Sequence, residues 1–181
     1  MKILAVLIAL CISGCANAPR VDYAEMPSSL YSSDPDDAAL QEAQVMFGPS
    51  GQRPAALRDR ARGFAALEYI SGALQVHPRW VALSDAAKLK LTQIRVAARE
   101  AIGVAPAAKS QTVVNVLLAV SRTKDDTALM ANLNDPIFTL GARATRERLE
   151  NLLPMGEIGS NLQIVSQEVT ALNNKASTGG Y

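Results

Sequence analysis

Few side chains in this chain of 181 residues could do chemistry, and two of them are thiols. The only two cysteines, Cys11 and Cys15, both lie near the start, so the rest of the chain can form neither an internal disulfide nor a thiolate metal cluster. Cys11 belongs to the apolar run 3–12, where a cysteine serves as a small hydrophobic residue. Cys15 follows that run and two small residues, and its sulfur is the strongest nucleophile among the side chains there.

Residues 1–14 have the order of a secretory signal peptide. Lys2 is followed by the uncharged apolar run 3–12 and then by Ser13 and Gly14. A permanent membrane-spanning helix needs about 20 apolar residues, and polar side chains follow this run too soon. A buried helix of the protein core is the alternative, but the succession of basic, apolar and small residues favours a signal peptide.

The four residues Ile12, Ser13, Gly14 and Cys15 resemble the lipobox of bacterial lipoproteins, in which an aliphatic and two small residues precede a modified cysteine. The resemblance covers the leader alone. It implies that a diacylglyceryl group alkylates the Cys15 sulfur, that the chain is cut after Gly14, and that the freed amine is acylated. Two or three acyl chains hold a protein on a bilayer persistently, whereas one is marginal. Ordinary signal cleavage that leaves Cys15 as a free thiol is the alternative.

The residue after the modified cysteine bears on location. In the lipoprotein family an aspartate there favours retention in the inner membrane, whereas this chain has Ala16, which resembles cargo of the outer membrane. For a bacterium with two membranes, the resemblance therefore implies a protein anchored by its lipid to the outer membrane and facing the periplasm. The inner membrane and the cell surface stay open as alternatives.

Candidates for catalysis or metal binding are sparse beyond Cys15. His77 is the single histidine, so a histidine-based triad would have to be built around it, but its place before Pro78 favours a helix end or a packed ring. Asp34, Asp36 and Asp37 lack the glycine and the distant glutamate of a calcium loop, and helix capping explains them better. The sequence has no phosphate-binding loop, and we predict no catalytic residue, no metal and no cofactor.

Three classes of function remain. The shortage of catalytic groups favours a non-enzymatic binding, scaffold or assembly module whose partner is another envelope protein. Glu68 and Glu100 keep a hydrolase of cell wall or lipid open, because carboxylates that are distant in sequence can pair in space. A structural lipoprotein with a basic face on anionic headgroups is the third. Nucleic-acid binding fits poorly, because the net charge is +1 and aromatic residues make up 4% of the chain.

Residues 15–33 are predicted to be a flexible tether between the lipid and the domain, because they mix prolines and serines with few large apolar residues. Residues 16–47 carry one basic and six acidic side chains, whereas residues 53–109 carry ten basic and four acidic ones. The acidic segment could therefore dock on the basic middle of the chain.

The same charge distribution could instead leave a basic face free. Lys88, Arg95 and Arg99 gather on one strip of an expected helix and are the best candidates for a contact surface with anionic lipid headgroups. Ordinary solvated helix faces are the plain alternative. Leu89 and Val96 lie on another side of that helix, apart from its main apolar stripe, which predicts a helix packed between neighbours.

From Asp34 onward, the start and stop signals predict an all-α domain over 34–174, a bundle of six or seven helices followed by a disordered tail at 175–181. The run 113–120 is short, apolar and β-branched, which suits either a buried strand or a helix. A helix is favoured, because no second run could pair with a strand. The other expected helices are 35–47, 54–77, 84–102, 125–133, 135–153 and one that begins at a capping box, 160–163.

Overall fold

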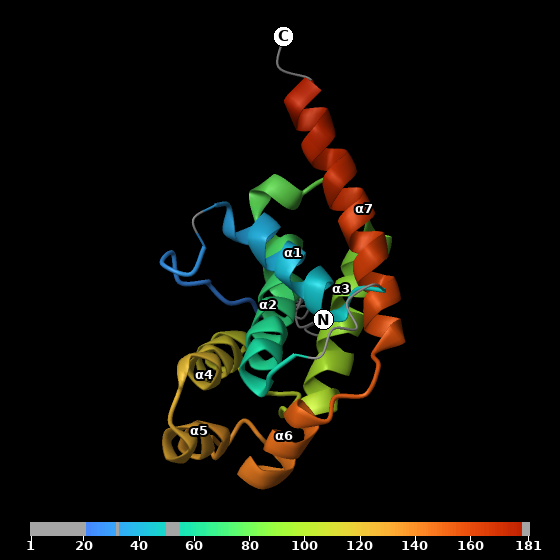
Figure 1. The fold of residues 1–181 in the computed structure, drawn as a ribbon. Helices are drawn as coiled ribbons and strands as arrows, with labels where there is room; N and C mark the ends of the chain where they lie inside the picture. Colours follow the sequence, from blue (N-terminus) through green and yellow to red (C-terminus); the bar gives the residue numbers. More distant parts are fainter. Residues whose placement is uncertain (1–20, 32, 50–54, 179–181) are drawn as a thin grey trace, which may run out of the picture.

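The computed structural model describes residues 21–31, 33–49 and 55–178, and the lipobox-like residues with Cys15 lie outside these ranges. The described residues form seven α-helices and no strand, which confirms the predicted all-α bundle (Figure 1). The helices are α1 (Pro35–Phe47), α2 (Leu57–Val76), α3 (Asp85–Ile102), α4 (Ser110–Arg122), α5 (Asp126–Leu133), α6 (Gly141–Glu150) and α7 (Gly156–Thr178), with a short 3₁₀ turn at Pro78–Trp80.

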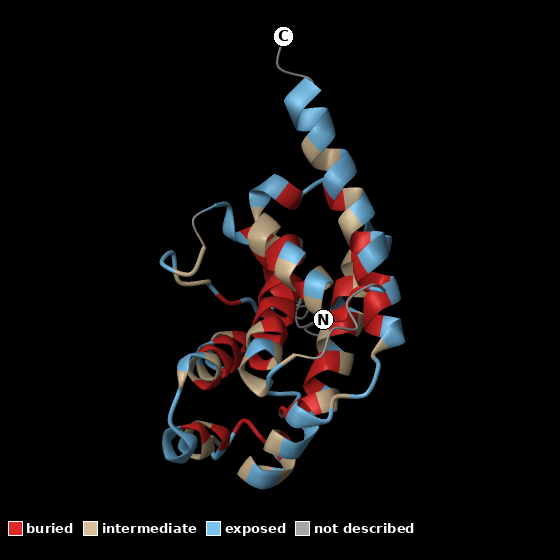
Figure 2. Ribbon diagram, viewed as in Figure 1, coloured by how far each residue is buried: buried red, intermediate tan, exposed pale blue. Residues whose placement is uncertain are grey.

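Four helices form the centre of the bundle. Helices α1 and α3 each pack against both α2 and α7, so α1 and α3 lie on opposite sides of that pair. Helix α4 covers a further face of α2, and α5 and α6 close one end. The middle of α2 is buried over a continuous stretch (Figure 2), and its many alanines let the neighbouring helices approach closely.

Several helix ends follow local rules that the sequence predicts. Asp34, Ser84 and Asp125 each accept a hydrogen bond from a backbone N–H in the first turn of α1, α3 and α5. Gly103 ends α3 in the left-handed conformation, with φ of 72°, which glycine adopts without steric cost. The ambiguous run 113–120 is helical, as part of α4.

The helix predicted from 135 to 153 is wrong at its start. Asp135 does not cap a helix; its side chain accepts from the Ile137 backbone N–H at 3.0 Å and closes a turn. Ile137 and Phe138 are buried, and the backbone beside them pairs with the segment after α3, through Thr139 N–H donating to the Gly103 carbonyl at 2.8 Å. Burial of these two side chains therefore delays α6 to residue 141.

Helix α7 is longer than predicted at both ends. It begins at Gly156 instead of at the expected capping box, and the Ser160 hydroxyl donates to the Gly156 carbonyl at 2.8 Å, within the helix. It continues through Thr178, so residues 175–178 of the expected tail are helical. This end projects beyond the rest of the bundle (Figure 1). None of the helices in the described ranges combines the length and apolar character needed to cross a bilayer.

The N-terminal segment 21–31 is docked on the bundle, which corrects the expectation of a flexible tether over its full length. Ala24 is buried, and the Glu25 N–H donates to the Gln111 side chain of α4 at 2.7 Å. The Tyr31 hydroxyl donates to Glu42 of α1 at 2.6 Å. The segment thus crosses the bundle, and docking of the acidic segment on the domain is the alternative that the structure supports.

Gly72 allows this docking, and its replacement gives a test. A Cβ added at Gly72 would lie 2.6 Å from the Arg95 guanidinium, 2.7 Å from the Tyr23 Cβ and 2.8 Å from the Tyr23 Cα. Because alanine favours a helix interior over glycine by about 1 kcal/mol, Gly72→Ala should leave α2 intact and displace the segment instead. We expect faster amide hydrogen exchange at Glu25, measured by NMR or mass spectrometry.

Gly156→Ala is the matched control, because no atom lies within 4 Å of a Cβ added at Gly156. It should leave exchange at Glu25 unchanged. Unaltered exchange at Glu25 in Gly72→Ala would contradict the docked position of the segment.

Candidate functional site

Glu68, one of the two candidate catalytic glutamates, is buried on α2 between two arginines of α3. Arg99 donates to both of its carboxylate oxygens, at 3.0 and 2.7 Å, and Arg95 lies 3.4 Å away. The hydroxyl of Ser110, at the start of α4, donates to the same carboxylate at 2.7 Å. A buried ion must be paired and hydrogen-bonded. The partners of Glu68 come from α3 and α4, so its carboxylate holds α2, α3 and α4 together.

The N-terminal segment completes this cluster. Arg95 donates to the Asp22 carbonyl at 2.7 Å, and the Ser110 backbone N–H donates to the Asp22 carboxylate at 2.8 Å. Burial lowers the pKa of Arg95, with Glu68 and Asp22 opposing that shift and Arg99 adding to it. Asp22, Glu68, Arg95 and Arg99, with Ser110, form what we term the Glu68 cluster, in which two acids balance two bases.

The predicted basic contact surface is not formed as expected. Arg99 is only 8% exposed, and Arg95 is directed into the Glu68 cluster; of the three candidates, Lys88 alone has no role in it. The three residues do lie along one side of α3, but Arg95 and Arg99 are directed toward α2, where the Glu68 carboxylate is paired with both guanidinium groups. Glu100 is exposed and does not join Glu68.

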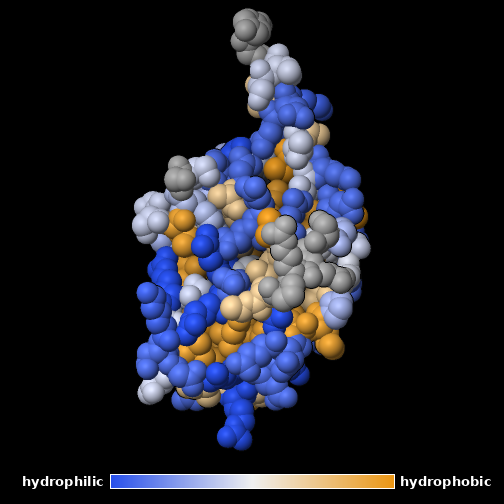
Figure 3. Space-filling view, in the orientation of Figure 1, coloured by the Kyte–Doolittle hydropathy of each residue, from blue (hydrophilic) through white to orange (hydrophobic). Residues whose placement is uncertain are grey.

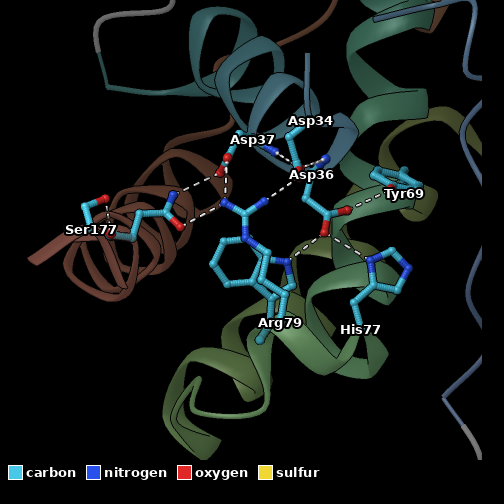
Figure 4. A network of polar contacts seen from close by, with 9 residues as sticks. Asp34, Asp36, Asp37, Tyr69, His77, Arg79 and Ser177 are labelled. Carbon is cyan, nitrogen blue, oxygen red and sulfur yellow. Dashed lines mark hydrogen bonds and ion pairs between the residues drawn. The ribbon is translucent and has the colours of Figure 1, made fainter. Parts of the chain in front are cut away.

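A second buried acid, Asp36, organises another side of α2, from Tyr69 to the end of the helix at His77 (Figure 4). Its carboxylate accepts hydrogen bonds from the Tyr69 hydroxyl at 2.6 Å and from the Trp80 indole N–H at 2.7 Å, and the His77 Nδ1 lies 3.0 Å away. Burial alone would raise the pKa of Asp36, but the hydrogen bonds from Tyr69, His77 and Trp80 outweigh it and hold that pKa below its ordinary value. Burial and this carboxylate in turn raise the pKa of Tyr69.

His77 therefore ends α2 and packs as a ring, as the sequence predicts. Its second ring nitrogen points away from Asp36 (Figure 4). Asp36 is the only hydrogen-bonding partner of the imidazole ring in the part of the chain that the structure describes, and no nucleophile there is hydrogen-bonded to the ring to form a triad. Nor do the described residues bring together three or more groups suited to binding a metal ion.

Arg79 extends the network to the outside of the bundle. It binds Asp37 at 2.8 Å and Asn173 of α7 at 2.9 Å, and it also contacts Asp34 (Figure 4). Its guanidinium lies 4.3 Å from the ring centre of Trp80, which is buried. The acidic cluster at the start of α1 thus caps the helix and links it to α7, which explains three aspartates that resembled part of a calcium loop.

An apolar groove, which sequence reasoning missed, is the best candidate for a binding site. Its volume is about 590 Å³, and it lies between the end of α3, the link from α6 to α7, and the start of α7. Figure 3 shows hydrophobic surface where that link runs. Leu153 is 80% exposed. The lining residues are mostly apolar, namely Ala97, Ala101, Leu152, Leu153, Pro154, Met155, Gly156 and Ile158, with Glu100, Arg148, Asn151 and Glu157 among them.

Arg148 joins the groove to α3. Its guanidinium donates to the carbonyls of Glu100 and Ala101 at 2.9 and 3.3 Å. The helix predicted from 135 to 153 includes Leu152 and Leu153, and so gives no sign of an exposed link at this point. Because α6 ends at Glu150, the link leaves them open.

Comparison with models of known protein families, with curated proteins and with solved structures finds no match for this chain. The features that bear on function are therefore the groove, the two buried acid networks and residues 1–15.

The Asp36 network predicts a pH-dependent contribution to stability. Asp36→Asn keeps the shape and removes the charge, and we expect it to lower the free energy of unfolding by about 1 to 3 kcal/mol near neutral pH. Because the folded pKa lies below the unfolded value of about 3.9, the charge stabilises the fold fully above that pH. The stabilisation declines as the pH falls toward the folded pKa, so the difference between the two proteins in urea unfolding should shrink there.

Asp85→Asn is the control, because Asp85 is an exposed acid in the first turn of α3. It should change stability by a few tenths of a kcal/mol, within the range of about 0.3 to 1 for an exposed charge at a helix end. A difference between Asp36→Asn and the parent that stays constant down to pH of about 3 would contradict the role given to the Asp36 charge.

Proposed function

We propose that this chain is a lipid-anchored protein of the bacterial cell envelope that acts as a non-enzymatic binding module, a scaffold or assembly aid for another envelope protein. The lipobox-like residues that end at Cys15 support the anchor. The apolar groove supports the binding role, and it is the observation on which that role depends.

The groove has the properties of a protein-binding surface. A cleft of some hundreds of Å³ with apolar walls and a few polar groups is the usual form of a small-molecule site, whereas exposed apolar surface at its edge, rimmed by polar residues, marks a surface that a protein can cover. Leu153 exposes 80% of its surface, and covering an exposed leucine by a partner contributes about 1.5 to 3 kcal/mol when burial is complete. Glu100 and Arg148 stand beside the apolar wall and would orient a partner by hydrogen bonds at the edge of the contact. The partner we propose therefore presents apolar side chains flanked by polar ones.

The state of the two glutamates also favours binding over hydrolysis. A pair of catalytic carboxylates must both face the substrate, at about 5 to 10 Å from each other. Glu68 is 2% exposed and fully engaged by Arg99 and Ser110, whereas Glu100 is exposed and lines the groove. An acid that stabilises two arginines cannot leave them without a large cost, about 3 to 5 kcal/mol for a broken buried pair.

Photocrosslinking in living cells tests the binding role. A photoreactive amino acid in place of Leu153 should give a covalent adduct of one discrete protein in the envelope fraction, because the groove would hold the partner against it. Val81 is the matched control, since it is 79% exposed but lies outside the groove. It should give no such adduct after the same irradiation.

A second substitution connects the adduct to the groove. Ala101→Arg places a long charged side chain in the apolar wall and should abolish the adduct at Leu153 while leaving the protein folded. The binding role would be contradicted by the same adducts at Leu153 and Val81, or by no protein adduct at Leu153.

A further inference from the structure

The outer side of α3 carries apolar side chains that nothing in the described structure covers. Leu89 and Val96 are 57% and 61% exposed, and their spacing of seven residues places them on one side of the helix. The main stripe of α3, with Leu91 and Ile94 fully buried, faces the core instead. Helix α3 does pack between α2 and α7, as expected, but Leu89 and Val96 stay exposed, so its second apolar side is not covered.

The point where the N-terminal segment reaches the bundle lies beside this face. Asp22 is held by Arg95, the residue that precedes Val96, and by Ser110 at the start of α4. Six residue steps separate Cys15 from Val21, which span about 20 Å when fully extended. A free tether over 15–33 would instead have spanned about 60 Å. A lipid on Cys15 would thus keep this part of α3 close to the bilayer.

The side chains near this point suit a membrane surface. Val21 and Tyr23 are 37% and 45% exposed, and tyrosine prefers the boundary where one end of the ring is apolar and the other is hydrated. We define the α3 outer face as Leu89 and Val96, because Tyr23 lies against Gly72 and the His77 ring at α2.

Charges around the face bear on what holds it. Lys88 and Lys109 lie on α3 and just before α4, whereas Asp85 and Glu100 lie on the same side of α3 as the face, four residues before Leu89 and four after Val96. Their signs balance, so the surroundings do not form a strongly basic surface. Contact with lipid would therefore depend on the apolar side chains and not on anionic headgroups.

We propose that the α3 outer face lies on the lipid bilayer, so that the domain is held in a fixed orientation with α1 directed away from the membrane. This inference rests on the proposed lipid anchor at Cys15. The short link and its exit beside Arg95 select the bilayer as the occupant, because they bring the face to the lipid whichever protein partner is present.

Site-specific fluorescence on the full lipidated protein tests the orientation. With Cys11 removed and Cys15 alkylated, the mature protein has no other thiol, so Val96→Cys and Val45→Cys each take one nitrobenzoxadiazole label. Val45, on α1 at the opposite side of the bundle, is 56% exposed and is the matched control. In phosphatidylcholine vesicles that contain lipids with quenchers on their acyl chains, quenching at position 96 should exceed that at position 45 several-fold.

The outcomes separate the two proposals. Protein that fails to float with the vesicles would overturn the anchor and the orientation together. Protein that floats but shows equal quenching at the two positions would overturn the orientation alone. Quenching that needs phosphatidylglycerol and disappears in high salt would overturn an apolar contact in favour of a charge-held one. Matching circular dichroism and thermal unfolding of both labelled variants and the parent would show that the comparison concerns folded protein.

Discussion

The Glu68 carboxylate fixes how the N-terminal segment meets the bundle. A buried charge must find compensation, and Glu68 finds it in Arg99, Arg95 and the Ser110 hydroxyl. The Arg95 guanidinium and the Ser110 backbone each have a further N–H group, and Asp22 accepts a hydrogen bond from both. Neutralisation of one acid on α2 therefore determines where the chain leaves the domain, which in turn limits how far the domain can move from a lipid on Cys15.

The second buried acid has a comparable role on another side of α2. Asp36 gathers the indole N–H of the single tryptophan, the hydroxyl of Tyr69 and the single imidazole, so the groups that sequence inspection would first examine for catalysis are hydrogen-bonded to one structural carboxylate. Its neighbours Asp34 and Asp37 reach Arg79, which connects α1 to α7. The two buried acids thus hold helices together, and the groove proposed for binding is apolar.

The fold could be predicted from the sequence wherever local chemistry decides the outcome. Helices 35–47 and 84–102 agree with α1 and with α3 from its Ser84 cap, since a capping side chain and a stop signal act within one turn. The helix at 135–153 was misplaced because Ile137 and Phe138 pack against a segment more than thirty residues earlier, which no local signal reports. The free tether was wrong beyond residue 21 for the same reason, since Asp22 finds its partners on α3 and α4.

The predicted basic contact surface failed for the same reason, because contacts between distant residues decide it. Periodicity placed Lys88, Arg95 and Arg99 on one strip, but only the fold reveals that Glu68, 31 residues before Arg99, neutralises it. Periodicity also found the second apolar side of α3 without telling whether a helix covers it. Neutron reflectometry of the lipidated protein on a supported bilayer tests the central claim most directly. We expect protein density that begins at the headgroups, and a water layer several tens of ångströms thick between lipid and protein would contradict it.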